Sequence, residues 1–295
     1  MIRRTASLAE DYARRHGVPR WYDDAQALIH DPDVDVVYIA TPPSSHREYT
    51  LLVAQAGKPV YVEKPMALNF DECQQMIDAC KKAGVRLFVA YYRRALPRFL
   101  KVKELIDTGA IGEIRFVSTT LTQPLRPEEL DPQAQPWRVQ PETAGGGHFV
   151  DLSCHLLDFF DYTLGRIRDV QGFASNQTQR YAAEDIVSAA FMYESGVQAV
   201  GTWCFSAFER FDRTEIVGSA GKIAFATFDA TPIVLTTDKS VSEFAIDNPA
   251  HIQQPLIQMI VDELNGVGAC PSTGESAART SWVMDQLLKT YYEKA

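Results

Sequence analysis

The chain has 295 residues, of which 46% are hydrophobic and 23% are charged. This length favours two domains, and the composition is typical of a folded globular protein and excludes disorder, collagen and coiled coil. The formal net charge of −9 argues against a broad nucleic-acid-binding surface. No apolar run approaches the ~20 residues that a membrane span needs. We therefore expect a small-molecule substrate and neither a nucleic-acid nor a membrane partner.

The first 95 or so residues alternate between helix and strand. Helices are expected at 7–16, 24–30, 46–56 and 69–84, and strands at 34–40, 60–62 and 85–90. The run from Val36 to Ala40 is apolar throughout, as in a parallel strand that is buried on both faces. This alternation predicts the α/β class, with a doubly wound parallel sheet of the Rossmann type.

The pattern changes beyond residue 112. Strands are expected at 170–174, 186–193, 197–205, 214–217, 222–226 and 233–237, and helices at 145–164, 255–265 and 276–292. Short turn signals separate the strands, so we predict an open, mainly antiparallel α+β sheet with a free or dimer-forming face. We place the domains at 1–100 and 101–295, with the C-terminal helix packing back on the first.

The five cysteines are scattered and form no Cys-x-x-Cys pair. A dispersed, odd-numbered set in a sequence without a recognisable secretion signal is typical of reduced thiols in the cytoplasm. Cys73 and Cys80 lie seven residues apart on an expected helix, which favours core packing over a metal site. We therefore expect a cytoplasmic protein without a metal centre.

Two motifs follow neighbouring strands at their carboxyl ends, where ligands bind in open α/β sheets. Residues 41–46, Thr-Pro-Pro-Ser-Ser-His, open a helix whose N-terminus favours anionic groups. Glu63-Lys64-Pro65 would place a cation in the same region, where it could polarise a carbonyl or a hydroxyl. Each motif also has a plain structural interpretation: a proline-rich turn capped by Ser45, and a surface salt bridge at a strand end.

A third motif runs from Gly145-Gly146-Gly147 to Asp151, His155 and Asp158. The spacing puts the three polar side chains on one face of a helix, so the carboxylate of Asp151 could orient His155 and raise its basicity. The glycines would let the backbone approach a ligand closely. A structural Asp–His pair remains an alternative, and no further ligand residue supports a metal.

Taken together, the three motifs and their intervals resemble the glucose–fructose oxidoreductase and inositol dehydrogenase family (Gfo/Idh/MocA), including its dihydrodiol dehydrogenases and anhydrofructose reductases. The resemblance covers essentially the whole chain. It implies a Rossmann domain, a second domain that carries substrate contacts and a homodimer or larger homo-oligomer interface, and hydride transfer between NAD(P) and a sugar, polyol or cyclic diol.

The resemblance also implies roles for individual residues. Lys64 matches the family's catalytic lysine, and Asp151 and His155 match its catalytic pair, with His155 as proton donor or acceptor. The implied cofactor-binding residues are Arg3, Arg4, Thr41, Pro42, His46, Glu63 and Lys64. The implied substrate-binding residues are Tyr91, Tyr92, Arg93, Trp137, Arg138, Asp151 and His155.

The chain departs from the family pattern at its start, because residues 1–60 contain no Gly-x-Gly-x-x-Gly turn. We expect either a chain that lacks the N-terminal strand, glycine turn, helix and strand, or a partner or rearrangement that covers the edge strand at 34–40. Arg3 and Arg4 favour NADP, with NAD as the alternative, because arginines bind a 2′-phosphate. Without the turn we expect weak NAD(P) binding.

Three functions remain open at this point. The leading hypothesis is an NAD(P)-dependent oxidoreductase, supported by Thr41, His46, Glu63 and Lys64. The second is a non-catalytic binding or scaffold protein that has lost dinucleotide binding, supported by the absent glycine turn. The third, a cofactor-independent lyase or hydrolase that uses Asp151 and His155, lacks a second activated nucleophile.

Overall fold

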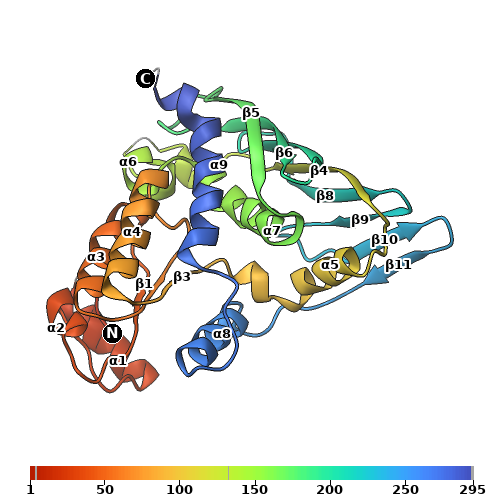
Figure 1. The fold of residues 1–295 in the computed structure, drawn as a ribbon. Helices are drawn as coiled ribbons and strands as arrows, with labels where there is room; N and C mark the ends of the chain where they lie inside the picture. Colours follow the sequence, from red (N-terminus) through yellow and green to blue (C-terminus); the bar gives the residue numbers. More distant parts are fainter. Residues whose placement is uncertain (4, 132, 294–295) are drawn as a thin grey trace.

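The computed structural model describes residues 1–3, 5–131 and 133–293. Two sheets organise these residues, a three-stranded parallel sheet and an eight-stranded mixed sheet. In Figure 1 the N-terminal part, in red and orange, lies on one side, the large sheet lies on the other, and the long blue helix α9 (Gly274–Tyr292) lies between them. The predicted combination of an α/β part with an α+β part is confirmed.

The parallel sheet has the strand order β1-β2-β3. Its strands are β1 (Val37–Ile39), β2 (Val60–Val62) and β3 (Leu87–Val89). The helices of this part are α1 (Ala6–His16), α2 (Ala25–Ile29), α3 (His46–Gln55) and α4 (Phe70–Ala83). Each expected element is present, because local caps fix the boundaries: the side chain of Asp24 accepts from two backbone N–H groups of α2, and Asn69 accepts from Glu72 N in α4.

Strand β1 lies at the edge of this sheet, and its middle side chain, Tyr38, is 46% exposed. The expectation that 34–40 is buried on both faces is therefore wrong for the face that carries Tyr38. Val37 and Ile39 do face the core. The ring of Tyr38 stacks on that of Tyr61 from β2, with centroids 4.6 Å apart, so its cover comes from one neighbouring strand only.

The large sheet has the order β11-β10-β9-β8-β4-β7-β6-β5. Its strands are β4 (Ile114–Thr122), β5 (Ile167–Ser175), β6 (Ile186–Tyr193), β7 (Gln198–Cys204), β8 (Phe211–Gly218), β9 (Gly221–Phe225), β10 (Ile233–Thr237) and β11 (Val241–Phe244). All neighbours pair antiparallel except β4 and β7, which are parallel. The mainly antiparallel sheet is confirmed, with this one parallel pair as a correction.

The remaining helices connect the sheets or cover them. They are α5 (Pro97–Asp107), α6 (Pro141–Ala144), α7 (Cys154–Leu164), α8 (Gln254–Leu264) and α9 (Gly274–Tyr292), with the short 3₁₀ turns η1 (Pro43–Ser45), η2 (Tyr92–Ala95), η3 (Pro127–Glu129) and η4 (Trp137–Val139). A π-helical turn, η5 (Phe149–Ser153), precedes α7, so the single helix expected at 145–164 is wrong in its first half. No described helix is long and apolar enough to cross a membrane.

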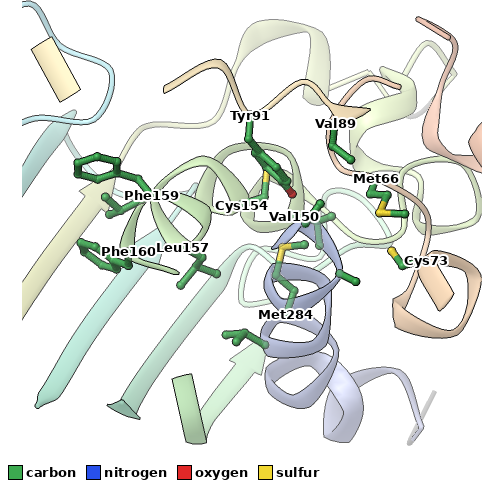
Figure 2. Packing of buried hydrophobic residues seen from close by; sticks show 14 of the residues in the cluster. Met66, Cys73, Val89, Tyr91, Val150, Cys154, Leu157, Phe159, Phe160 and Met284 are labelled. Carbon is green, nitrogen blue, oxygen red and sulfur yellow. The ribbon is translucent and has the colours of Figure 1, made fainter. Parts of the chain in front are cut away.

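A continuous hydrophobic core joins the two sheets through α7 and α9. Helix α9 contacts α4, α7 and β5, and Thr273 just before it forms a β-bridge with Phe88. Figure 2 shows part of this core, where side chains from residues 66–91, 150–160 and α9 meet: Met66, Cys73, Val89, Tyr91, Val150, Cys154, Leu157, Phe159, Phe160 and Met284. Because one close-packed core includes residues of both sheets, it fixes the position of one sheet relative to the other.

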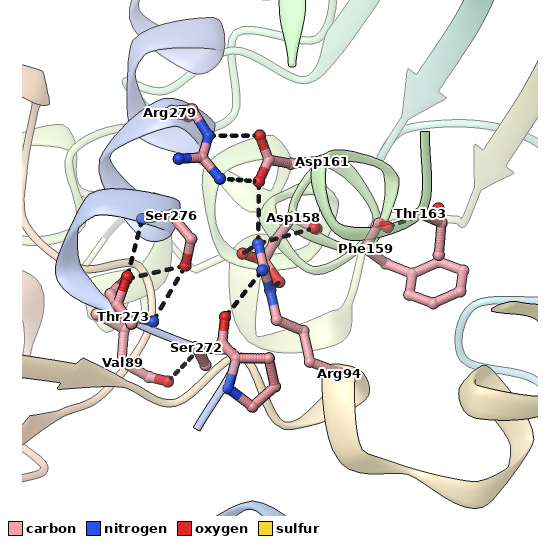
Figure 3. Close-up of polar contacts among 11 residues, drawn as sticks. Val89, Arg94, Asp158, Phe159, Asp161, Thr163, Ser272, Thr273, Ser276 and Arg279 are labelled. Carbon is pink, nitrogen blue, oxygen red and sulfur yellow. Dashed lines mark hydrogen bonds and ion pairs between the residues drawn. The ribbon is translucent and has the colours of Figure 1, made fainter. Parts of the chain in front are cut away.

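Buried ion pairs fix the same junction (Figure 3). Arg94 from η2 donates to both carboxylate oxygens of Asp158 on α7, each at 2.7 Å, and also bonds the Pro271 carbonyl. Asp161, one turn further along α7, accepts two hydrogen bonds from Arg279 of α9 at 2.7 and 2.6 Å. Such bidentate pairs have strict geometry, so they set how η2, α7 and α9 lie against one another.

Candidate functional site

Lys64 and Asp151, 87 residues apart in the sequence, form the centre of the site. Lys64 follows β2, and Asp151 lies in the π-helical turn. The Lys64 Nζ donates to the Asp151 Oδ1 and to the Asp151 carbonyl oxygen, both at 2.7 Å. The two side chains are only 15% and 14% exposed. The structure thus brings two of the three predicted catalytic residues into direct contact.

The charges of this pair stabilise each other. Burial disfavours the ammonium of Lys64, but the negative groups nearby outweigh burial and raise its pKa. Burial likewise opposes ionisation of Asp151, yet the charge and hydrogen bond of Lys64, together with Arg138, lower its pKa. Arg138 Nε is 3.3 Å from Asp151 Oδ2, and its guanidinium lies over the Trp137 ring at 4.4 Å. The carboxylate therefore lies between two cations.

The expected Asp151–His155 pair is wrong. His155 Nδ1 is buried without a hydrogen-bond partner among the described residues, and the Asp151 carboxylate faces Lys64 and Arg138 instead. Burial, with the positive charges of Arg93 and Lys64, lowers the pKa of His155 well below its usual value. The imidazole is therefore neutral, and its basicity is reduced where the spacing led us to expect an increase.

The glycines at 145–147 serve protein packing. A Cβ on Gly147 would lie 2.8 Å from both Ala183 Cβ and the Glu184 carbonyl oxygen. The backbone N–H of Gly147 donates to the buried Glu184 carboxylate. Gly145 has a φ of +82° and packs against the backbone of Leu68. The expectation of close ligand approach is wrong at Gly147, because other parts of the chain fill the space there.

His46 does not face the site as a ligand-binding ring. It is fully buried, its Nε2 lies 2.7 Å from the Thr41 carbonyl, and its Nδ1 lies 3.1 Å from the Pro65 carbonyl. His46 therefore connects the loop after β1 with the loop after β2. The expected contact of its ring with a cofactor is wrong, because both ring nitrogens face backbone carbonyls. Thr41 and Pro42 are exposed at the start of η1, where the Thr41 hydroxyl accepts from Ser45.

Glu63 is held by neighbours that the motif alone does not reveal. Its Oε1 accepts from the Tyr38 hydroxyl and from Gln253 Nε2, the latter at 2.7 Å, and its Oε2 accepts from Lys64 N at 3.1 Å. The Gln253 Oε1 in turn accepts from the Tyr61 hydroxyl. These bonds orient the carboxylate beside Lys64. Gln253 has no recognisable motif in the sequence.

The segment after β3 divides into buried and accessible residues. Tyr91 is fully buried, and Arg93 is 4% exposed and donates to the Thr227 carbonyl at 3.1 Å, so direct substrate contact is wrong for both. Tyr92 is half-buried, and its ring lies 5.0 Å from that of His155. The ring of Phe228, which no sequence pattern singles out, lies 6.2 Å from that of His155.

Arg3 lies apart from these residues, at the strand-like bridge between Ile2 and Tyr22. It is exposed, and its guanidinium lies 4.9 Å from the centre of the Tyr12 ring. Arg4, the second residue expected to bind a 2′-phosphate, lies outside the described residues.

The polar residues around Lys64 suit one end of a nicotinamide dinucleotide better than the other. Lys64, Glu63 and Thr41 sit beyond the carboxyl ends of two parallel strands, as the nicotinamide end requires. Among the described residues before Lys64, the glycines with positive φ, Gly17 and Gly57, follow the ends of helices. The residues present fit the nicotinamide and its ribose; the pyrophosphate cradle is not among them.

Comparisons with known proteins agree with this geometry. Residues 1–91 match a model described as an oxidoreductase family with an NAD-binding Rossmann fold, and residues 99–224 match the GFO/IDH/MocA C-terminal domain. An oxidoreductase of Formosa agariphila is 35% identical over 98% of this chain and 89% of its own length. The 1,5-anhydro-D-fructose reductase of Ensifer adhaerens is 27% identical over 93% of this chain and 83% of its own.

Among solved structures, an aldose-aldose oxidoreductase from Caulobacter crescentus complexed with glycerol is similar with a TM-score of 0.86 and 26% identity. That match covers 100% of this chain and 89% of the other. Fold, site residues and sequence similarity lead to one conclusion: the chain belongs to the Gfo/Idh/MocA family of NAD-binding oxidoreductases.

Proposed function

We propose that this protein transfers hydride between a nicotinamide cofactor and a carbon that bears a hydroxyl group in a sugar, polyol or cyclic diol. The observation that carries the proposal is the contact of Lys64, beyond the carboxyl end of a parallel strand, with Asp151 at 2.7 Å, four residues before the buried imidazole of His155. Relatives named 1,5-anhydro-D-fructose reductase, trans-1,2-dihydrobenzene-1,2-diol dehydrogenase and myo-inositol 2-dehydrogenase support this substrate class.

A nicotinamide cofactor held by Thr41, Glu63 and Lys64 would supply the hydride acceptor when the substrate C–H bond breaks in the oxidation direction. His155 takes the hydroxyl proton as the carbonyl forms, and it returns the proton in the reverse direction. The Lys64 ammonium donates a hydrogen bond to the substrate oxygen, on which negative charge develops. Asp151 holds Lys64 in place, so Asp151 positions the cation and His155 handles the proton.

For the cofactor we infer NADP, with NAD as the alternative, held at its nicotinamide end by Thr41, Pro42, Glu63 and Lys64. Arg3 supports NADP, because its guanidinium is exposed and no carboxylate of the described residues pairs with it. Fluorescence titration with NADPH and NADH tests this choice. Tighter NADPH binding that Arg3→Ala reduces supports it, and equal binding of the two contradicts it.

We further infer a domain division at 1–100 and 101–295, and a homodimer through the outer face of the large sheet. Phe173, Val200 and Phe116 lie on that face and are 84%, 53% and 46% exposed. Small hydroxyl residues such as Thr202 lie among them, so the face is flat and weakly polar. Val200→Asp should convert a dimer to a monomer in light scattering, whereas an unchanged mass contradicts this interface.

The five cysteines are free thiols in the structure, which supports the inferred cytoplasmic location. The function itself is tested by following nicotinamide absorbance with a panel of sugars, inositols and anhydrosugars. Turnover that Lys64→Met and His155→Asn each reduce by about 10²-fold or more supports the proposal. Turnover that survives both substitutions contradicts the assigned roles.

A further inference from the structure

Two partly exposed aromatic side chains lie near His155, and one of them, Phe228, has no role in the proposed function. The imidazole is 3% exposed, and the rings of Tyr92 and Phe228 lie 5.0 and 6.2 Å from it. Both rings are half-buried, while Arg93 behind them is 4% exposed and lies 4.6 Å from the centre of the Phe228 ring. Tyr92 and Phe228 are therefore two partly exposed rings within about 6 Å of the His155 ring.

The loop that carries Phe228 is held unusually firmly for a connection between two strands. Three successive N–H groups, of residues 227, 228 and 229, donate to the carboxylate of Asp212. Arg98, 6% exposed, donates to the carbonyls of Asp229 and Thr231 at 2.6 and 2.8 Å. Arg93 donates to the carbonyl of Thr227.

Burying two guanidinium groups is costly, and here they bind backbone carbonyls of one short loop. Such fixation reduces the entropy that a binding surface loses when a ligand arrives. A phenyl ring held this rigidly presents a flat apolar face, and this suits the C–H face of a saturated ring better than a flexible open chain.

We propose that Phe228 is a specificity-determining residue that selects cyclic over open-chain polyols, with Arg93 and Arg98 as the residues that position it. This inference rests on the proposed function, because it takes His155 as the group at the reacting hydroxyl. The ring of the substrate packs on Phe228 while its hydroxyl reaches the imidazole. An open-chain polyol with as many hydroxyl groups gains less from the same face.

Two probes with six hydroxyl groups each, myo-inositol and D-glucitol, test the inference. Binding is measured by calorimetry in the presence of NADPH, because neither polyol can accept hydride and the complex does not turn over. The unsubstituted protein should bind myo-inositol more tightly. Phe228→Ala should weaken myo-inositol binding by about tenfold and change D-glucitol binding by less than about twofold. Phe228→Tyr, which keeps the flat ring, should retain the preference.

Phe208→Ala is the matched control, because this phenylalanine is 98% exposed and its substitution should leave both affinities unchanged. If Phe228→Ala does not fold, Phe228→Leu replaces it in the test, because leucine keeps the apolar volume but lacks the flat ring face. Phe228→Leu should then weaken myo-inositol binding more than D-glucitol binding. A preference that survives Phe228→Ala, or equal losses for both polyols, overturns the role of Phe228. The hydride-transfer proposal would still stand on its own turnover assay. A protein that binds neither polyol, or prefers D-glucitol, overturns the cyclic selectivity.

Discussion

Replacing Lys64 with methionine removes the ammonium from the centre of the site while keeping most of the side-chain volume. Two hydrogen bonds of 2.7 Å disappear, and Asp151, 14% exposed, keeps only Arg138 as a cationic neighbour at 3.3 Å. Breaking a buried pair costs about 3–5 kcal/mol of unfolding free energy. Because Arg138 remains and both groups keep some solvent, we expect about 2–3 kcal/mol here.

Urea denaturation measures this loss, and a double-mutant cycle with Asp151→Asn isolates the pair. The two single losses should exceed the loss in the double mutant by about 1–3 kcal/mol. Lys103→Met is the control, since Lys103 pairs with Asp107 on the surface of α5 and such a pair contributes about 0.3–0.5 kcal/mol. Equal destabilisation by Lys64→Met and Lys103→Met would refute the reasoning.

The pH dependence gives a second check on the same pair. The lowered pKa of Asp151 contributes stability above its unfolded value near 4, and this contribution is lost as pH falls through the folded pKa. The raised pKa of Lys64 contributes stability below about 10 and loses it as pH rises through the folded pKa. The difference between wild type and Lys64→Met should therefore be constant from about pH 5 to 9.

Two further predictions concern residues around the site. Burial raises the pKa of Asp285 from 3.8 to about 6, so its ionisation destabilises the fold progressively between these pH values and fully above about pH 6. Asp285→Asn should therefore add about 1–2 kcal/mol at pH 8 in thermal or urea denaturation and almost nothing at pH 4. An effect that does not change with pH contradicts this cause. Gly147→Ala should lower the free energy of unfolding by about 1–3 kcal/mol, because the new Cβ would lie 2.8 Å from Ala183 Cβ and from a carbonyl oxygen. An unchanged urea midpoint would show that Ala183 moves aside without a cost in stability.

The sequence predicts the parts of the fold that local rules determine. Asp24, Asn69 and Gly84 act as caps through contacts with residues at most a few positions away, so the helices they bound are predicted well. Strand β4 and helix α5 are not predicted. In β4, Ser118 and Thr120 alternate with buried residues and resemble a polar loop, until the sheet provides neighbours on both sides.

The contact between Lys64 and Asp151 could be predicted from the sequence, whereas the catalytic roles of these residues stay predictions. Lys64 and Asp151 meet because strand ends and loops converge at one sheet edge, which the motif order indicates. The i, i+4 spacing of Asp151 and His155 implies a shared helix face, but the π-helical turn at 149–153 changes the helical repeat between them. Phe228 lies 73 residues beyond His155, and only the tertiary fold brings the two rings together.

The charges around His155 also bear on how the work of catalysis is divided. Burial, Arg93 and Lys64 all disfavour the imidazolium, so a proton transfer to His155 is uphill unless the substrate hydroxyl is made more acidic. In the proposed mechanism the Lys64 ammonium does this by stabilising the developing alkoxide. Under this mechanism Lys64→Met should lower kcat more than His155→Asn does, and raising the pH should restore the His155 variant partly, because hydroxide can then take the proton. Stopped-flow measurement of hydride transfer from pH 6 to 10 tests this order. A larger loss of rate in His155→Asn than in Lys64→Met at every pH would mean that the imidazole contributes more to catalysis than Lys64 does, despite its lowered pKa.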